Sequence, residues 1–351
     1  MTRSVQHWFV HKGAYDGDLK ASPATYRRAA AAAAVPRTPT LGCLSPAATY
    51  AAIVEIGAHK ARTPFWKTFL LGILGGFYIS LGGALAYAIG GQLPEILQTD
   101  PGLQKLIFAC FGLPMSLMLI LIAGADLYTF NAACVPAALY EGRANIIQLV
   151  SNFIFSFFGN IVGCLIIVWL LDETYIFASP AAKTFPFLQG RQKSYNAWGT
   201  EVVRGMFANY LVCLAAWQAT AAQDIIGKIF AIFFPVVAFV GTGYSHVIAN
   251  AFWIPFSIKL GSGIPVGHYI VHSMIPDWLG NTLVAAFVLA GGYALLYGSL
   301  GDTINAGYQR ILGRSNGSSS DGDYTTDDSR DLGRPDHLSP VIVEESGPKS
   351  V

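Results

Sequence analysis

The chain contains six stretches of apolar residues that can cross a lipid bilayer, and this feature constrains its fold more than any other. A helical crossing needs about 20 apolar residues. The crossing must be helical because each backbone N–H and C=O group has to find its partner inside the segment. The sequence predicts spans at 69–89, 106–124, 146–171, 205–222, 229–243 with a continuation, and 282–300. The predicted fold class is therefore an all-α membrane protein with six transmembrane helices.

Composition supports a membrane protein and excludes several functions. Only 12% of the 351 residues are charged and 53% are hydrophobic, whereas about 25% of the residues in soluble domains are charged. A soluble enzyme of this size would lack its charged surface. The net charge of +1 gives no basic surface for nucleic acid, and the sequence has no glycine-rich nucleotide loop of the GxxxxGK type. We therefore expect no nucleic-acid partner, no bound cofactor and no ATP-driven pump.

The cysteines and histidines do not predict a metal site. The five cysteines are scattered without a Cys-x-x-Cys pair, and cysteine in an apolar stretch is usually a small core residue. His268 and His272 are four residues apart and could share a helix face, but no cysteine stands beside them. Structural metal sites need more ligands than this pair supplies.

Composition divides the chain into four parts. Residues 1–43 are rich in Arg and Ala and poor in acids, which fits either a disordered leader or an organelle transit peptide. Residues 44–65 predict an amphipathic helix on the membrane surface, because Ser45 can cap its start and a proline follows. Residues 66–300 hold the six spans. Residues 301–351 are rich in Gly, Ser and Asp and are expected to be disordered.

Two of the spans are interrupted by polar residues. After Gly124 the run Ala-Asp-Leu-Tyr-Thr-Phe leads to Asn131, and after Gly243 the run Tyr-Ser-His-Val-Ile-Ala leads to Asn250. In both places a short apolar run follows, with a proline five residues after the asparagine. Non-helical backbone at membrane depth is tolerated only where it is buried in protein or lines a cavity. We therefore predict that the second and fifth helices are broken near the middle of the membrane.

The two interruptions belong to a duplicated unit of three spans. Gly124 and Gly243 are 119 residues apart, and the Gly-Asn pairs at 159–160 and 280–281 are 121 residues apart. Because each copy has an odd number of spans, the second copy must insert upside down. Paired broken helices in two inverted halves indicate a binding site at the midplane of a transporter or channel.

Several motifs stand in the same order as in a known family. They are Gly-Ala-Asp-Leu-Tyr-Thr-Phe-Asn at 124–131, Phe-Gly-Asn at 158–160, Ala-Asn-Tyr-Leu-Val-Cys-Leu-Ala-Ala-Trp at 208–217, Gly-Tyr-Ser-His-Val-Ile-Ala-Asn at 243–250 and Leu-Gly-Asn at 279–281. Over residues 44–300 the chain resembles the formate–nitrite transporter family, and it is most similar to the algal branch linked to passage of nitrite or bicarbonate into plastids. The resemblance implies an aquaporin-like helical fold, a homopentamer in lipid, and one pore in each subunit for small monovalent anions such as formate, nitrite, lactate or bicarbonate. It points to the plastid envelope, with the plasma membrane as the alternative.

His246 is the ionisable residue that stands out among the apolar residues of the second interruption. An ionisable group at membrane depth is a functional-site hypothesis by default, although a buried histidine can also be a packing residue. Burial disfavours the charged imidazolium, so the ring is expected to be neutral. The resemblance implies that His246 is the central histidine of the pore. We hypothesise that it shares a proton with a passing anion and so reduces the cost of a full charge in an apolar tube.

The resemblance also implies roles for three polar residues. Thr129 in the first interruption and Asn209 on the fourth span would hydrogen-bond the anion beside the histidine. For Asn209 the alternative is a hydrogen bond that holds two spans together. Lys193, between the third and fourth spans, would raise the local anion concentration in the outer vestibule, and the alternative is an ordinary loop lysine.

Apolar constrictions are expected on both sides of the site because apolar rings exclude hydrated ions. By the resemblance the candidates are Leu113 and Leu117 on the second span and Phe239 on the fifth. Two residues depart from the family pattern. Ser245 stands where an acid usually precedes the histidine, and Phe130 stands where a small residue is usual, so the choice of substrate is expected to differ.

Three functions compete on these observations. The first is a channel or transporter for nitrite, formate or bicarbonate. The second is an aquaporin-like channel for neutral solutes, which usually has two Asn-Pro-Ala boxes that neither interruption contains. The third is a membrane-embedded enzyme, which would need several ionisable groups at one depth, whereas this chain offers only His246 with Asp126. We therefore predict that the protein is not an enzyme.

Overall fold

The computed structural model describes residues 42–312. The predicted leader therefore lies almost wholly outside the described residues, and so does the predicted tail after residue 312. The helices up to Ala306 belong to one compact unit, and a second unit begins at Gly307. All regular structure in the described residues is helical, apart from an isolated bridge between Cys43 and Ala222.

Five stretches of helix in this part of the chain are long and apolar enough to cross a membrane. They are Phe65–Gln92, Pro101–Ala123, Ile146–Asp172, Ile225–Thr242 and Val266–Tyr297. The predicted fourth span corresponds to α10 (Trp198–Ala221), which has 24 residues but carries Glu201 and Arg204. The all-helical fold is confirmed. The last span begins at Val266, well before the predicted core at residue 282.

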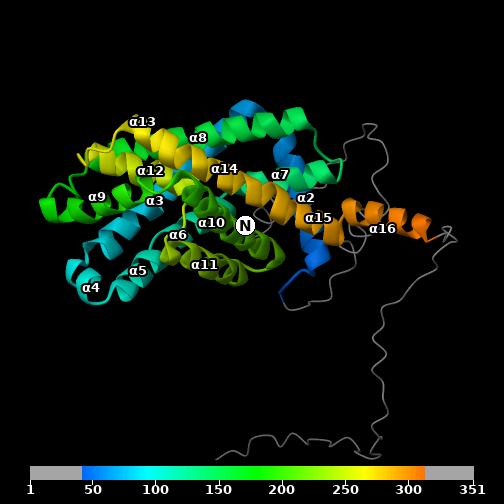
Figure 1. Cartoon of the computed structure of the whole chain (residues 1–351), viewed down its shortest axis with the longest axis horizontal. Coiled ribbons are helices and arrows are strands. Elements are labelled where there is room, and N and C mark those ends of the chain that lie inside the picture. Colours follow the sequence, from blue (N-terminus) through cyan, green and yellow to red (C-terminus); the bar gives the residue numbers. More distant parts are fainter. Residues whose placement is uncertain (1–41, 313–351) are drawn as a thin grey trace, which may run out of the picture. The chain divides into compact units, whose positions relative to one another are not determined.

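The elements of the two halves follow one order (Figure 1). The first half consists of α2 (Pro46–Arg62), α3 (Phe65–Ile89), η2 (Gly90–Gln92), α4 (Pro94–Thr99), α5 (Pro101–Cys110), α6 (Leu113–Ala123), α7 (Tyr128–Tyr140) and α8 (Ile146–Asp172). The second half consists of α9 (Pro180–Ser194), α10, α11 (Ile225–Thr242), α12 (Val247–Lys259) and a last long helix made of α13 (Val266–Tyr269), η3 (Ile270–Met274), α14 (Ile275–Leu283), η4 (Val284–Ala290) and α15 (Gly291–Tyr297). The first membrane span of each half packs along the third span of that half: α3 packs on α8, and α10 packs on α14.

Both predicted interruptions are present in the structure. Residues 124–127 separate α6 from α7, and residues 243–246 separate α11 from α12. Each interruption starts with a glycine in the left-handed region, Gly124 with φ 87° and Gly243 with φ 79°. A side chain would have open space at both positions, so it is the backbone conformation that requires glycine here.

Asn160 on α8 satisfies the backbone of the first interruption. Its amide nitrogen donates to the carbonyl oxygens of Gly72 (2.7 Å) and Asp126 (2.8 Å). Its amide oxygen accepts the backbone N–H of Tyr128 at 2.9 Å. One side chain therefore pairs two backbone groups of the interruption, the Asp126 carbonyl and the Tyr128 N–H, and ties them to the backbone of α3 at Gly72.

Asn281 on α14 makes the same three hydrogen bonds in the second half. It donates to the carbonyl oxygens of Gly205 (2.9 Å) and Ser245 (3.2 Å), and it accepts the N–H of Val247 at 3.1 Å. The two partners on the interruption lie 119 residues after those of Asn160. The duplication inferred from the sequence thus extends to individual hydrogen bonds.

Small residues allow the first and third helices of each half to approach closely. A side chain at Gly76 would overlap the backbone of α8, and one at Gly163 would overlap the backbone of α3. In the second half a side chain at Gly280 would overlap the backbone of α10. Close approach of this kind is typical of helices packed in membranes, and here it brings both asparagines within reach of the interruptions.

The repeat also includes a short helix before the three spans of each half. The hydroxyl of Ser45 accepts the N–H of Ala48 (3.3 Å) at the start of α2, and the hydroxyl of Ser179 accepts the N–H of Ala182 (3.2 Å) at the start of α9. In both places a proline follows the serine. The helix expected at 44–65 is therefore the first element of the first repeat, with α9 as its counterpart. In the structure α2 buries one face against α7.

The expectation of a disordered tail from residue 301 is wrong for its first part. The chain continues as a helix, α16 (Ser299–Ile311). Its start is stabilised by the carboxylate of Glu141, which accepts the N–H of Ser299 at 3.0 Å. A composition rich in small polar residues does not prevent a helix when a buried acceptor pairs its first N–H group.

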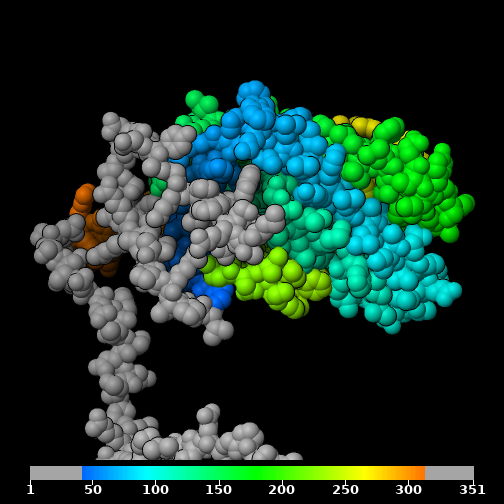
Figure 2. All heavy atoms as spheres, turned by 180° about the vertical axis from the view of Figure 1, so that it is seen from behind, coloured from blue at the N-terminus to red at the C-terminus, as the bar shows by residue number. Residues whose placement is uncertain are grey.

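Large apolar side chains are exposed on the outside of the spans. Figure 2 shows a face that includes α3 in sky blue, where Trp66 is 55% and Leu70 53% exposed. On α11 Phe230 is 60% and Phe234 65% exposed. Apolar surface of this extent is unfavourable in water, so these faces fit contact with lipid or with another subunit.

We predict that Asn281→Ala lowers thermal stability more than substitution of an exposed asparagine. The change leaves two buried backbone groups of the interruption without partners, and each unpaired group costs about 1–3 kcal/mol. It also removes the hydrogen bond to the Gly205 carbonyl on α10. The midpoint of thermal unfolding in detergent measures the effect. Asn305→Ala on the exposed face of α16 is the control, and equal midpoints for the two variants would contradict the role of Asn281.

Candidate functional site

His246 is the last residue of the second interruption and caps the start of α12. Its Nδ1 accepts the backbone N–H of Ala249 at 3.1 Å, and the side chain is almost completely buried. Since Nδ1 acts as an acceptor, the proton of a neutral ring must be on Nε2. Nε2 lies 2.9 Å from the hydroxyl oxygen of Thr129, so it donates to that oxygen.

Thr129 lies in the first turn of α7, directly after the first interruption. Its side chain is fully buried. Because its oxygen accepts the Nε2 proton of His246, its own hydroxyl proton can be donated to another acceptor. The structure thus brings a residue from each interruption together across 117 positions of sequence, as the resemblance leads us to expect.

Asn209 on α10 lies beside this pair, but its donors are occupied. Its amide nitrogen donates to the backbone carbonyls of Thr129 (3.1 Å) and Asn281 (2.8 Å). The thiol of Cys213 lies 3.5 Å from its amide oxygen. Of the two alternatives for Asn209, the geometry favours a bond that ties α10 to the two halves, since no amide N–H remains for an anion.

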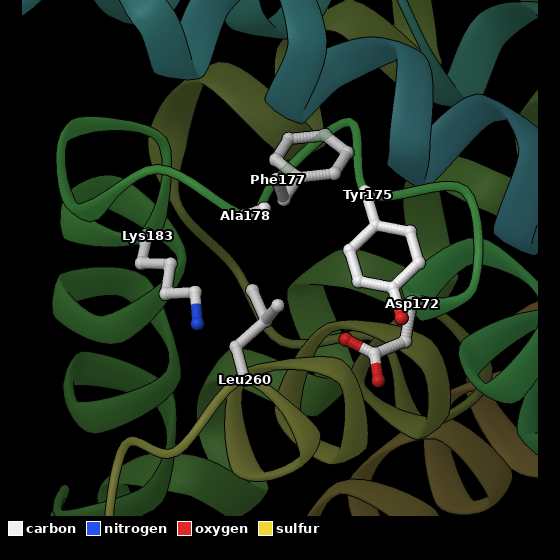
Figure 3. A pocket seen from close by; sticks show the side chains of 6 residues that line it. All are labelled: Asp172, Tyr175, Phe177, Ala178, Lys183 and Leu260. Carbon is white, nitrogen blue, oxygen red and sulfur yellow. The ribbon is translucent and has the colours of Figure 1, made fainter.

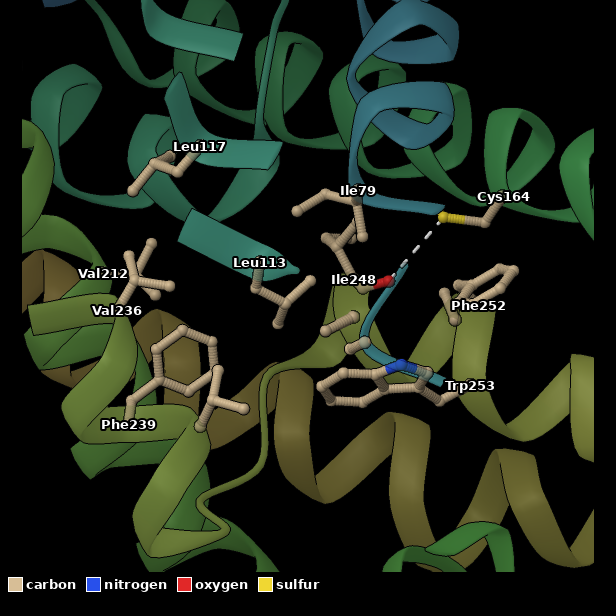
Figure 4. Packing of buried hydrophobic residues seen from close by; sticks show 14 of the residues in the cluster. Ile79, Leu113, Leu117, Cys164, Val212, Val236, Phe239, Ile248, Phe252 and Trp253 are labelled. Carbon is tan, nitrogen blue, oxygen red and sulfur yellow. Dashed lines mark hydrogen bonds between the residues drawn. The ribbon is translucent and has the colours of Figure 1, made fainter. Parts of the chain in front are cut away.

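The three predicted constriction residues lie in one buried cluster, part of which Figure 4 shows. Leu113, Leu117 and Phe239 are each 3% exposed or less. The Phe239 ring centroid is 5.8 Å from that of His246. The cluster therefore borders the histidine through Phe239, and the constriction role of the three residues stays a prediction.

The internal repeat points to a second apolar set that sequence reasoning missed. Ile120 and Ile232 stand 119 residues from Phe239 and Leu113, respectively. Both are buried, and both line a cavity of about 100 Å³ beside the first interruption. The same cavity is lined by Leu127, which stands 119 residues before His246. The offset of the two glycines was the signal that could have found these residues.

Lys193 on α9 is not an ordinary loop lysine. It is 6% exposed, and its Nζ donates to the carbonyl oxygen of Tyr244 at 3.2 Å. Nζ also lies 5.2 Å from the ring centroid of Trp253. Burial lowers the pKa of Lys193, and the charges of Glu201 and Asp277 offset part of this effect. The lysine therefore lies against the second interruption, and its role in a vestibule stays a prediction.

Lys60 on α2 is the counterpart of Lys193 and was not identified from the sequence. The two lysines are 133 residues apart, as are Gly72 and Gly205. Lys60 forms an ion pair with the carboxylate of Asp126 in the first interruption. Burial is the largest influence on the pKa of Lys60 and acts to lower it, but the charges of Asp126 and Cys134 and the hydrogen bond to Asp126 together outweigh burial, so the pKa is raised.

An acid of α10 contacts Ser245 but forms no ion pair with Lys193 among the described residues. The Ser245 hydroxyl donates to the buried carboxylate of Glu201. The same carboxylate accepts the side-chain amide of Asn196 at 2.8 Å and lies 3.8 Å from the guanidinium of Arg204. Nothing in the sequence singled out Glu201, because it becomes part of the site only when α10 packs against the second interruption.

Two further features lie apart from the site. The rings of His268 and His272 stack with centroids 4.4 Å apart, and no group of three or more His, Cys, Asp or Glu in the described residues could hold a metal ion. Figure 3 shows a cavity of about 130 Å³ at the end of α8. Its lining consists of Asp172, Tyr175, Phe177, Ala178, Lys183 and Leu260, none of which was predicted for the site.

The fold and the site together define a class of membrane protein. Two inverted halves place two interrupted helices side by side, with a histidine and a threonine at their junction and a lysine near each interruption. This is the architecture of a channel or transporter whose site is at the midplane.

Comparison with known proteins names the family. A family model described as Formate/nitrite transporter matches residues 47–295. A probable formate transporter of Methanothermobacter thermautotrophicus is 35% identical over 268 residues, which cover 72% of this chain and 97% of the relative. The formate channel FocA of Escherichia coli (strain K12) is 30% identical over 279 residues, which cover 72% of this chain and 94% of the relative. The chain belongs to the formate/nitrite transporter family.

Solved structures show the same fold. A pentameric formate channel with formate bound has 24% sequence identity and a TM-score of 0.58, covering 66% of this chain and 97% of that chain. An FNT family ion channel has 23% identity and a TM-score of 0.59, covering 70% and 97%. The protein is thus an integral, multi-pass membrane protein of a family of channels and transporters, and it is not an enzyme.

We predict that Thr129→Val lowers the midpoint of thermal unfolding, whereas Thr129→Ser does not. Valine keeps the shape of threonine but leaves the buried Nε2 proton of His246 without an acceptor, at a cost of about 1–3 kcal/mol. Serine keeps the hydroxyl. If both variants unfold at the same temperature, the bond between His246 and Thr129 does not stabilise the protein.

Proposed function

We propose that the protein conducts small monovalent anions, with formate the first to test and nitrite and bicarbonate as further candidates, through a pore in each subunit of a homopentamer. Two relatives that match this chain over most of their own length are named a formate transporter and a formate channel. A structural neighbour is described as a pentameric formate channel with formate bound. The observation that carries the proposal is the contact between His246 and Thr129, which joins the two interruptions at a buried point.

An anion at this point exchanges water for two hydrogen-bond donors. Transfer of an unpaired charge into an apolar interior is very unfavourable. The hydroxyl proton of Thr129 and the Nε2 proton of His246 are the donors that can face an anion after the bond between them opens. The amide of Asn209 acts indirectly, because it holds the carbonyl oxygen of Thr129.

Sharing of a proton with the anion depends on Nδ1 of His246. A neutral ring can donate a hydrogen bond from Nε2 but has no proton to give away, since its loss would leave an imidazolate. Transfer to the anion requires the imidazolium form, in which Nδ1 is protonated and can no longer accept the N–H of Ala249. Proton sharing in this protein is therefore coupled to loss of the hydrogen bond that caps α12.

The buried apolar sets control access to the site. Leu113, Leu117 and Phe239 border the histidine, and Ile120 and Ile232 line the cavity near the first interruption. Apolar constrictions exclude hydrated ions until they widen or wet. An anion must therefore shed water before it reaches His246, and this is where the loss of charge by proton sharing has its largest effect.

We predict that His246→Asn reduces formate uptake into proteoliposomes by about tenfold or more, since a hydrogen bond to a charged group contributes about 1.5–3 kcal/mol. Asparagine can still cap α12. Uptake by the wild type is expected to rise as the pH falls, because imidazolium becomes more populated, and the variant is expected to lose this additional rise. The measurement is initial uptake of formate, nitrite and bicarbonate over a pH series.

Two controls separate the histidine from other effects. Liposomes without protein report diffusion of the neutral acid at each pH. His272→Asn removes a histidine that lies apart from the site and is expected to leave uptake unchanged. Wild-type uptake with the same rate and pH profile as His246→Asn would refute the role of the histidine.

We propose the plastid envelope as the membrane, on the basis of the resemblance to the algal branch and the Arg- and Ala-rich composition of residues 1–43. Fluorescence imaging of the full chain beside a chain that lacks residues 1–40 tests this. Plastid signal that is lost on truncation supports the proposal, and signal at the plasma membrane for both chains refutes it.

A further inference from the structure

The internal repeat makes it possible to compare the two ends of one conduction path. Lys60 corresponds to Lys193 at an offset of 133 residues, and Asp126 corresponds to Ser245 at an offset of 119 residues. The backbone around both positions is held in the same way by Asn160 and Asn281. A difference between the two ends must therefore come from the side chains.

At the first end the lysine is paired. The ammonium of Lys60 contacts the carboxylate of Asp126 in an ion pair, and both side chains are largely buried. Asp126 is itself fixed, because its N–H donates to the carbonyl of Leu71 at 3.0 Å and its carbonyl accepts from Asn160. Lys228 lines the same cavity, where its Nζ donates to the carbonyl of Ala219 at 2.9 Å.

At the second end the lysine has no contacting carboxylate. Lys193 makes no ion pair with any of the described residues, and the hydrogen bond that the structure assigns to its ammonium goes to the uncharged carbonyl of Tyr244. An ammonium has three donors, so two remain. Its nearest charged groups are Glu201, Asp277 and Arg204.

The two acids at this end are engaged elsewhere. Glu201 accepts from Ser245 and Asn196 and lies beside Arg204. Asp277 accepts from the amide of Asn250 at 2.6 Å and from the hydroxyl of Ser273 at 3.2 Å. Both carboxylates therefore compensate charge in the region without occupying the donors of Lys193.

The two lysines lie toward opposite ends of the predicted fourth span, α10. The cavity that Lys60 lines reaches Ala219 in the last turn of α10, whereas Glu201 beside Lys193 is in its first turn. These turns are 18 residues apart, or about 27 Å along a helix. The end of α10 also lies at the start of the described chain, because the N–H of Leu44 donates to the carbonyl of Ala221 at 2.9 Å.

We infer that the replacement of an acid by Ser245 leaves Lys193 as the available anion-binding cation of the path, so that anions bind more tightly from the Lys193 side than from the Lys60 side. At the Lys60 side the carboxylate of Asp126 occupies the place that an anion would take. At the Lys193 side the missing carboxylate is replaced by the transported anion itself. This inference rests on the proposed anion conduction and adds sidedness to it.

The test uses vesicles sorted by orientation. A protease-cleavable affinity tag follows Val351, and vesicles with the tag outside are separated on affinity resin from those with the tag inside. The start of α2 and the start of α16 meet at Glu141, and the sequence after residue 312 contains no apolar stretch of about 20 residues that could cross a membrane. We therefore expect the tag on the face at which α2 and α16 start, which is the face of the Lys60 end of α10. Initial formate uptake is then measured against external formate concentration for both populations.

We expect a half-saturating formate concentration about tenfold lower in tag-inside vesicles, within the range over which a focused charge raises local ion concentration. Lys193→Gln should remove this difference. Asp126→Asn should free Lys60 and lower the half-saturating concentration in tag-outside vesicles. Lys183→Gln, on the same helix as Lys193 but at the cavity of Figure 3, is the matched control and should change neither value.

Each outcome decides between the two proposals. Equal half-saturating concentrations for the wild type in both orientations would overturn the inference on sidedness and leave anion conduction intact. Absence of formate, nitrite and bicarbonate uptake in both orientations would refute the proposed function itself. The wild-type comparison needs no variant, and Asp126→Asn counts only if it elutes as the same oligomer as the wild type.

Discussion

The hydrogen bonds of Asn160 and Asn281 hold the interrupted backbone on which the site depends. A helix that stops inside a membrane leaves N–H and C=O groups that water cannot satisfy. Each asparagine pairs two of them and also bonds a carbonyl of the neighbouring span, α3 or α10. It can do so because glycines let α3 pack closely on α8 and α10 on α14. The two interruptions can then remain extended and present His246 and Thr129 to each other at a buried point.

The internal repeat gives both halves the same backbone, and the side chains that differ between the halves set the polarity and charge of the site. The position of His246 in one half is taken by Leu127 in the other, and the position of Asp126 is taken by Ser245. Because the surrounding backbone is braced equally in both halves, these exchanges alter polarity and charge without altering the fold. The junction therefore holds one imidazole, and the two lysines are unequally paired, which is the basis of the sidedness proposed for anion binding.

Much of the architecture could be predicted from the sequence, since glycine, asparagine and proline recur at one offset and only a few backbone conformations suit a membrane interior. The contact between His246 and Thr129 agrees with the prediction. The role of Asn209 could not be predicted from the sequence, because its two alternatives differ only in whether its amide donates to an anion or to a backbone carbonyl. Lys60 and Glu201 were missed, since a charged residue outside the apolar spans carries no sign of its partner. The helix after residue 299 was missed because its start is stabilised by Glu141, which lies far away in the sequence.

The sequence by itself determined that the chain is an all-helical membrane protein with two inverted halves and two broken helices. The length of the apolar stretches and the repeated glycines can be read locally, and few backbone conformations are possible inside a bilayer. Only the tertiary structure decided which lysine is paired, which donors of Asn209 are occupied and which nitrogen of His246 carries the proton. The lysine pairing and the Asn209 donors depend on contacts between residues that are 51 to 80 positions apart. The proton of His246 is assigned from a local bond to Ala249, and its partner Thr129 is 117 positions away. Such bonds form only when packing fixes donor and acceptor within about 3 Å of each other.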